Sequence, residues 1–356
     1  MKLFYPIIIL LLNCGYINGQ KIPDFVKGIY GNPGTLLEAG YDFKSLGVNA
    51  IFIRSISLNE EIFNSSKSQD VKVYVEFPTL NGKDYLQHHP DAWPINEKGE
   101  KASPADWFMG ICPTDQGFFD YRMNQLKSIL SKYEIDGIWL DYLHWHAQFE
   151  TPEPILPETC FCNRCTKLFS EAMAISVPSG SISRKAQWIL SSADSSWRAW
   201  RSQIINYWVT EMKNEVKKSR PEALLGIFYC SWFPSDYDGA LYNILGLDVK
   251  TLAGIADVLS PMLFHMMMGR SVDWVQEYTL WLKNYTGNTS GKNFRIWPIV
   301  QAHDHPGTIS AIEFRQVMLN GSEPPSTGIM MFSDQALIKN PEKVEVMKKL
   351  YQEDLK

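Results

Sequence analysis

The sequence has no excess of positive charge. Its 34 lysines and arginines are outnumbered by 39 aspartates and glutamates, which leaves a formal net charge of −5. Proteins that bind nucleic acid neutralise backbone phosphates with basic side chains, so this composition argues against a nucleic-acid partner. Beyond the first 20 residues no apolar run approaches the roughly 18 residues of a membrane-spanning helix, so we expect no transmembrane span in the mature chain.

Several well-known catalytic motifs are also missing. The chain has no glycine-rich phosphate loop, no G-x-S-x-G turn and no H-E-x-x-H pair. These absences argue against P-loop nucleotide chemistry, against the serine mechanism of α/β-hydrolases and against a zincin-type protease. We expect no cofactor, and the sequence gives no indication of oligomeric state.

The first residues resemble a targeting segment in their charge and hydropathy. Lys2 precedes an apolar run over residues 3–12, and a polar stretch follows over residues 13–20. About ten apolar residues are typical of a signal peptide rather than of a membrane span. We therefore predict a signal peptide at residues 1–19, a mature domain at residues 20–356, and a secreted or periplasmic protein. A lipid anchor on Cys14 is the alternative.

Eight short segments are rich in β-branched and aromatic residues, and each is almost continuously apolar. Such runs are typical of strands that are buried on both faces of a parallel sheet. The segments are Gly28–Asn32, Asn49–Ser55, Val71–Phe77, Gly137–Tyr142, Leu224–Cys230, Ala256–Leu263, Phe294–Gln301 and Gly328–Ser333. The one awkward feature is Pro298 inside the seventh segment, because proline cannot donate a hydrogen bond to a neighbouring strand.

Stretches with apolar residues at helical spacing fall between these segments. They are Leu36–Leu46, Asp120–Tyr133, Ser195–Ser219, Val272–Tyr285, Ser310–Leu319 and Pro341–Gln352. Alternating strands and helices over this length predict one (β/α)₈ TIM barrel. The longest insertions follow the third and fourth strands, on the side where such barrels build their active sites.

Three cysteines form a tight C-x-C-x-x-C cluster at Cys160, Cys162 and Cys165. Export favours disulfides. A metal site would need a fourth ligand, which Cys112, Cys230 or a histidine could supply. Disulfides, zinc and free thiols all remain open, and each would stabilise a loop rather than perform chemistry.

The fourth predicted strand ends in an ionisable residue. In the segment Gly137–Tyr142, Asp141 has the same parity as Trp139, which places its side chain on the barrel axis at the strand tip. A charge at the end of an apolar strand is costly unless it has a function or a partner. Arg54, at the end of the second strand, could be that partner. Asp136 precedes the strand and is expected to act as a cap at the bottom of the barrel.

The segment D-G-I-W-L-D-Y resembles the fourth-strand motif of the α-amylase-like and related retaining glycoside hydrolase barrels. In those enzymes the final aspartate is the nucleophile, and this implies the same role for Asp141. A longer pattern resembles bacterial families known as hypothetical glycoside hydrolase-like proteins. It consists, in chain order, of Ile111-Cys112-Pro113, Arg122, this motif, and C-F-C-x-x-C followed by Phe169. The resemblance implies a TIM barrel that cleaves glycosidic bonds in an oligo- or polysaccharide.

Glycoside hydrolysis needs a second carboxylate beside the first. Glu76 ends the third strand, and Asp236 follows the fifth, where amylase-like barrels place their acid. We rank these two nearly level, with Asp304 third. Asp238 and Asp334 also follow strands on the same end of the barrel. Any of these acids could instead pair with a base or cap a helix.

Polar and aromatic side chains near the same end could bind a sugar, since sugar rings stack on aromatic faces while polar groups bind their hydroxyls. The substrate-binding candidates are Tyr30, Arg54, His144, Trp145, Trp232, His265, His303 and Asp304. The two H-x-H pairs, at 144–146 and 303–305, leave a metal-dependent hydrolase such as a glycan deacetylase as an alternative, although we predict no metal at the active site. A non-catalytic carbohydrate-binding barrel is the other alternative.

Overall fold

The computed structural model describes residues 22–105, 107–287 and 294–355. The predicted signal peptide and Cys14 lie outside these ranges. The strands are β1 (Val26–Gly31), β2 (Ala50–Arg54), β3 (Lys72–Pro78), β4 (Gly137–Asp141), β5 (Leu224–Cys230), β6 (Val258–Leu263), β7 (Arg295–Ile296), β8 (Ile299–Gln301) and β9 (Gly328–Phe332). All pairings between them are parallel, and the β5–β6 and β1–β9 pairings close the sheet on itself.

The seventh strand of the barrel is divided into two pieces. β7 and β8 both pair with β6, and they are separated by Trp297 and Pro298. The proline has no N–H to donate, which explains why the strand is interrupted where the sequence contains it. With these two pieces counted as one strand, the protein is the predicted (β/α)₈ barrel.

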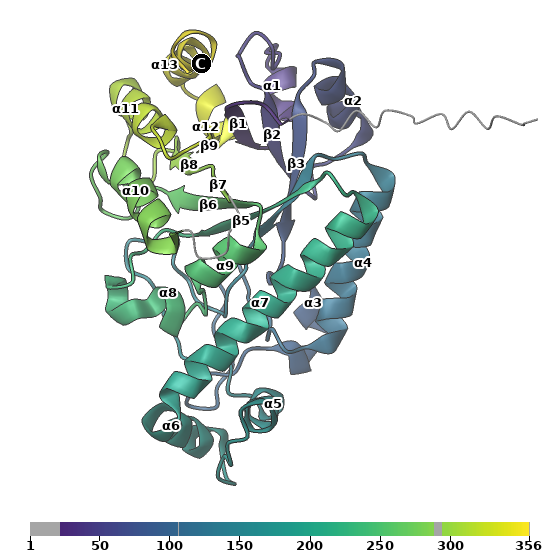
Figure 1. Ribbon diagram of the computed structural model, residues 1–356, viewed down its shortest axis with the longest axis vertical. Coiled ribbons are helices and arrows are strands. Elements are labelled where there is room, and N and C mark those ends of the chain that lie inside the picture. The colour runs from purple at the N-terminus through teal and green to yellow at the C-terminus, as the bar shows by residue number, and fades with distance from the viewer. Residues whose placement is uncertain (1–21, 106, 288–293, 356) are drawn as a thin grey trace, which may run out of the picture.

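Helices surround the barrel (Figure 1). Those that follow the barrel strands or belong to their insertions are α1 (Gly34–Glu38), α2 (Glu60–Ser68), α3 (Lys83–His88), α4 (Gln116–Lys132), α5 (Asn163–Met173), α6 (Ile182–Ser192), α7 (Asp194–Ser219), α8 (Ala240–Asn243), α9 (Val249–Ile255), α10 (Trp274–Thr286), α11 (Ala311–Ser322), α12 (Asp334–Ile338) and α13 (Pro341–Lys349). Short 3₁₀ turns cover Pro90–Ala92 and Asp236–Gly239, and a π turn covers Leu350–Asp354. Among the described residues, no helix combines the length and apolarity needed to cross a membrane.

Two of the predicted helices differ from the structure. The helix expected over Leu36–Leu46 ends at Glu38, and the chain continues in turns around Gly40 and Gly47, both of which have positive φ. The helix expected to reach Gln352 is α-helical only to Lys349, where the π turn begins. In both places the apolar spacing reflects side chains that pack on the barrel rather than a continuous helix.

Aromatic rings fill the lower part of the barrel. Phe52 stacks on Tyr74, and Trp139 stacks on Trp297 with ring centroids 5.4 Å apart. The indole N–H of Trp139 donates a hydrogen bond of 3.0 Å to Ser260 Oγ, so this buried donor is satisfied. Gly226 on β5 leaves room for the indole, because a Cβ there would lie 2.1 Å from Trp139 Cε2. This layer closes the barrel beneath the site.

Below the barrel, Asp136 acts as the predicted cap. Its carboxylate accepts a hydrogen bond from the backbone N–H of Val73 and forms ion pairs with Lys67 and Lys72. The acid therefore anchors the start of β4 at the end of the barrel opposite to Asp141.

Candidate active site

A cavity of about 1030 Å³ opens at the C-terminal end of the barrel. All eight strands of the barrel contribute side chains to it, and the insertions after β3 and β4 form part of its wall. The acids that line it are Glu76, Asp84, Asp141 and Glu150. Barrel enzymes place their chemistry at this end of the fold.

Glu76 lies deepest among these acids. In the sheet register it is level with Arg54 on β2 and Trp139 on β4, and only 4% of its surface is exposed. Burial raises its pKa well above the ordinary glutamate value, and the nearby charge of Asp141 raises it further. The Arg54 and Arg122 guanidinium groups oppose this shift. Burial and the neighbouring charge thus favour the protonated form of Glu76.

Asp141 lies at the tip of β4, as the sequence predicts. Its Oδ1 accepts a hydrogen bond of 2.7 Å from the backbone N–H of Tyr142, whose φ of 51° is unusual for a residue other than glycine. Burial raises the pKa of Asp141 to about 6, while this hydrogen bond and the charge of Arg54 act in the opposite direction. At neutral pH the carboxylate is mostly ionised.

Glu150 is a third acid in the cavity that the sequence analysis did not identify. It lies in the insertion after β4, and its Oε2 accepts a hydrogen bond of 3.1 Å from the indole N–H of Trp107, in the insertion after β3. Burial and the charge of Asp141 raise its pKa to about 7. No local signal points to Glu150, because it follows Asp141 by nine residues and is brought back to the cavity only by the path of the loop.

Two of the predicted substrate-binding residues line the cavity. The guanidinium of Arg54 lies 5.8 Å from the ring centroid of Tyr30, and that ring stacks on Phe332 and meets Phe228 edge-on. Arg54 thus provides positive charge between the acids without forming a direct ion pair with either Glu76 or Asp141. Asp141 is therefore not neutralised by an ion pair with Arg54.

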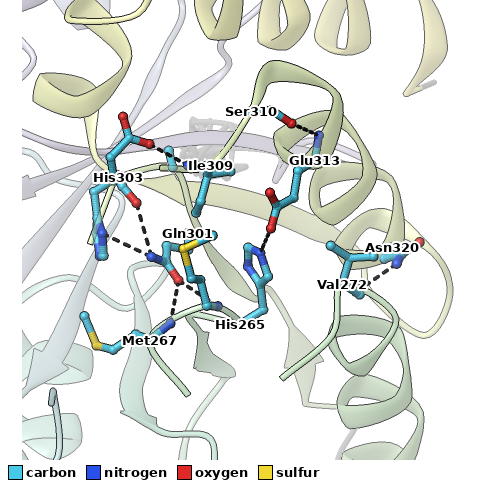
Figure 2. A network of polar contacts seen from close by, with 12 residues as sticks. His265, Met267, Val272, Gln301, His303, Ile309, Ser310, Glu313 and Asn320 are labelled. Atoms are coloured by element: carbon cyan, nitrogen blue, oxygen red, sulfur yellow. Dashed lines mark hydrogen bonds and ion pairs between the residues drawn. The ribbon is translucent and has the colours of Figure 1, made fainter. Parts of the chain in front are cut away.

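The other candidates on the sixth and seventh strands have partners outside the cavity. His265 bonds through Nε2 to Glu313 Oε1 at 2.9 Å, and Gln301 donates to His303 Nδ1 at 3.2 Å (Figure 2). Asp304 accepts from Lys343 Nζ and from the backbone N–H of Ile309. These contacts join the loop after β6 to α11 and the loop after β8 to α13. None of the three predicted residues lines the cavity.

The predicted substrate-binding residues after the fourth and fifth strands also contact other parts of the protein rather than the cavity. His144 Nδ1 donates to the Trp145 carbonyl oxygen at 2.8 Å. Trp145 is fully buried, and its indole N–H donates to the Arg201 carbonyl oxygen. Trp232 is 2% exposed and packs against Phe149 and Tyr237. None of these side chains lines the cavity, and their role in substrate binding stays a prediction.

Asp236, ranked level with Glu76 as the second carboxylate, does not line the cavity either. Its Oδ1 lies 2.9 Å from Arg270 Nη2, and its Oδ2 accepts from the backbone N–H of Phe233. The turn after β5 directs this acid toward an arginine rather than toward Asp141. Of the three predicted catalytic residues, the structure brings together Asp141 and Glu76.

The histidines do not form a metal site at the cavity. His146 accepts from the Gly110 N–H at Nδ1 and lies 3.0 Å from the Ser103 carbonyl at Nε2, so both ring nitrogens are used. Burial lowers the pKa of His144, His146 and His303 to about 4, and all three are neutral. In the part of the chain that the structure describes, the group of side chains close enough to hold a metal ion is a set of four cysteines outside this cavity.

Comparison with known proteins bears on the fold. No protein family and no curated protein matches the sequence. Among solved structures, the glycoside hydrolase domain of PgaB (BpsB) from Bordetella bronchiseptica is similar, with a TM-score of 0.68 and 11% identity over 92% of this chain and 99% of that one. The similarity shows that the two chains share the TIM-barrel fold.

Other similar structures include β-galactosidases. That of Marinomonas ef1 has a TM-score of 0.66 at 10% identity, over 91% of this chain and 58% of the enzyme. That of Bacillus circulans sp. alkalophilus has a TM-score of 0.65 at 13% identity, over 92% of this chain and 56% of the enzyme. The chain thus spans little more than half the length of these enzymes. At such identities the likeness extends to the barrel, and the relation to α-amylase-like barrels stays a prediction.

Proposed function

We propose that the protein hydrolyses a glycosidic bond, with Asp141 as the ionised carboxylate and Glu150 as the proton donor. The observation that carries the proposal is the meeting of Glu76, Asp141 and Glu150 around one cavity at the C-terminal end of the barrel. Glycoside hydrolysis requires one carboxylate to attack or to activate water and one carboxylic acid to protonate the departing oxygen.

The environments of the acids divide these roles. Asp141 has the lowest pKa of the three, because the Tyr142 N–H and the Arg54 charge favour its ionised form. Glu150, with a pKa of about 7, retains a proton for part of the time near neutral pH and can exchange it with solvent. Two neighbouring carboxyls whose surroundings separate their pKa values are the usual arrangement for a base and an acid.

Position favours Glu150 over Glu76 as the donor. The leaving group departs toward solvent, and Glu150 lies half-buried in the outer wall beside Trp107, whereas Glu76 is almost fully buried at the floor. We therefore assign Glu76 to the floor of the sugar site, where its carboxyl, whose protonated form is favoured by burial, can donate a hydrogen bond to a hydroxyl. This assignment differs from the sequence prediction, in which Glu76 or Asp236 was the partner of Asp141.

The walls of the cavity suit a carbohydrate. The rings of Tyr30, Phe228 and Phe332 cluster at its floor, and Arg54 provides a charged donor beside them. Aromatic faces stack on the C–H faces of sugars, while charged and amide groups bind the hydroxyls. The proposed substrate is an oligo- or polysaccharide, and export by the predicted signal peptide would place the protein where such polymers are found.

The test compares the activity of a variant on glycosides whose leaving groups differ in their need for protonation. Glu150→Gln removes the proposed donor, so turnover of unactivated glycosides should fall by about 10²-fold or more, as expected for a lost general acid. Aryl glycosides with a nitrophenolate leaving group need little protonation, and the variant should retain most of its activity on them. The two kinds of substrate are to be compared across a panel of sugars.

Matched variants complete the experiment. Glu153→Gln changes an exposed glutamate in the same insertion and should leave both activities unchanged. Asp141→Asn should abolish both. The assignment fails if Glu150→Gln hydrolyses unactivated glycosides at the wild-type rate, or if Glu76→Gln rather than Glu150→Gln shows the selective loss.

A further inference from the structure

Four cysteines from two distant segments meet beside the barrel. Cys112 follows β3 in the chain, and Cys160, Cys162 and Cys165 lie at the start of α5, in the insertion after β4. One sulfur from each residue lies within 4.8 Å of all the others. The Cys112 sulfur is 3.3 Å from that of Cys165 and 3.9 Å from that of Cys162.

These separations suit one tetrahedral metal ion. With Zn–S bonds of about 2.3 Å, the sulfurs of a tetrahedral site lie about 3.8 Å apart, close to the two separations just given. An iron–sulfur cluster holds several metal atoms between its cysteines and needs a wider set of sulfurs. A disulfide, by contrast, would bring two sulfurs to about 2.05 Å, much closer than either separation just given.

The surroundings stabilise thiolates. The backbone N–H of Ile95 donates to the Cys160 sulfur at 3.3 Å, and the N–H of Cys165 donates to the Cys162 sulfur at 3.4 Å. Cys162 caps the N-terminus of α5, where the helix dipole favours negative charge. Such hydrogen bonds from outside the ligand set orient metal ligands and spread their charge.

A positive group lies next to the same cluster. Arg164 donates through Nε to Thr114 Oγ1, which lies 3.2 Å from the sulfurs of both Cys112 and Cys165. Its guanidinium also pairs with Asp115 at 3.0 Å. A divalent ion with four thiolates carries two negative charges, and the arginine offsets part of that charge.

We propose that Cys112, Cys160, Cys162 and Cys165 bind a single zinc ion. Because all four ligand positions come from the protein, the ion has no open position for substrate and its role is structural. The site resolves the choice left open by the sequence, in which disulfides, zinc and free thiols were each possible. Cys112 is the fourth ligand, and Cys230, which is buried in β5, is separate from the set.

The ion would join the two insertions that form the outer wall of the cavity. The insertion after β3 carries Trp107 and the insertion after β4 carries Glu150, which are hydrogen-bonded to each other. The same two insertions also meet where Gly110 donates to His146. Zinc would therefore hold this wall in place, and its loss should loosen both insertions while the barrel strands remain paired.

The experiment measures metal content, which does not depend on the proposed glycosidase activity. The wild-type protein, purified with reductant and Zn²⁺ and then desalted, should contain about one zinc per chain. Cys162→Ser changes the least buried ligand and should reduce this to below about 0.1 per chain. Cys230→Ala, a cysteine outside the set, should keep the full amount.

Two measurements on the wild type alone guard against a variant that fails to fold. A mercurial reagent that blocks thiols should release zinc to a chromophoric chelator in proportion to the cysteines modified. Co²⁺ exchanged into the site should give the intense thiolate-to-cobalt absorption of a tetrahedral centre. Limited proteolysis should then cut residues 143–162 faster in the metal-free protein than in the zinc-bound one.

The opposite results would overturn the proposal. Protein prepared in this way that holds no zinc and shows no cobalt charge-transfer band has no such site. Disulfide-linked peptides joining Cys112 to any of the other three, recovered from the same preparation, would assign the cluster to disulfide formation instead. A loss of zinc in Cys230→Ala equal to that in Cys162→Ser would also contradict the ligand set.

Discussion

The substitution of Asp141 by asparagine should separate activity from stability. The folded protein raises the pKa of Asp141 from 3.8 to about 6, so its ionised form is less stable in the folded than in the unfolded chain. A difference of about two pKa units corresponds to about 3 kcal/mol. Asparagine is neutral at every pH, and its side-chain oxygen can still accept from the Tyr142 N–H. Asp141→Asn should therefore be more stable than the wild type above pH 6.

The sign of this effect depends on pH. At pH 8 Asp141 is ionised in both the folded and the unfolded chain, and the free energy of unfolding of the variant should exceed that of the wild type by up to about 3 kcal/mol. The difference should shrink as the pH falls and vanish below about pH 3, where the aspartate is protonated in both states. Urea unfolding of the two proteins at pH 8, 6 and 4 measures this difference, and turnover of the best aryl glycoside should fall by at least about 10²-fold. A variant that is active, or that is less stable than the wild type at pH 8, would refute the reasoning.

Three further substitutions test other parts of the account. Gly226→Ala should destabilise the fold by about 1–3 kcal/mol or more, measured by urea unfolding, because its Cβ would overlap the Trp139 ring. The wild type should lose stability as the pH falls from 6.5 to about 4, because protonation of His146, whose pKa is lowered on folding, favours the unfolded chain. His146→Gln should lessen this loss, and urea unfolding midpoints at pH 7 and 5 measure it. Arg54→Gln should raise the pKa of Asp141, because Arg54 favours the ionised form, and should therefore move the acidic limb of the pH–rate profile to higher pH.

The barrel could be predicted because each strand is a short apolar run of its own. The segment Leu224–Cys230 matches β5 residue for residue, and the other strands differ by one or two residues at their ends. Where the prediction was wrong, tertiary packing decided. Pro298 interrupts the seventh strand, and residues 36–46 are apolar at helical spacing because they cover the barrel between turns.

The site was only partly predictable. Asp141 and Glu76 could be identified because strand parity directs their side chains to the barrel axis. Glu150 and Cys112 could not be placed in the same way, because the long insertions after β3 and β4 determine where they lie. Asp236 illustrates the same limit, since a position after a strand does not show whether an acid faces the cavity or an arginine such as Arg270.

The pH dependence of kcat/KM on an unactivated glycoside tests the central claim most directly. With Asp141 ionised above about pH 6 and Glu150 protonated below about pH 7, the profile should be a narrow bell between these values. On an aryl glycoside, Glu150→Gln should lose the basic limb and keep the acidic one. A bell whose basic limb persists in Glu150→Gln, or a flat profile in the wild type, would contradict the assignment of the two carboxyls.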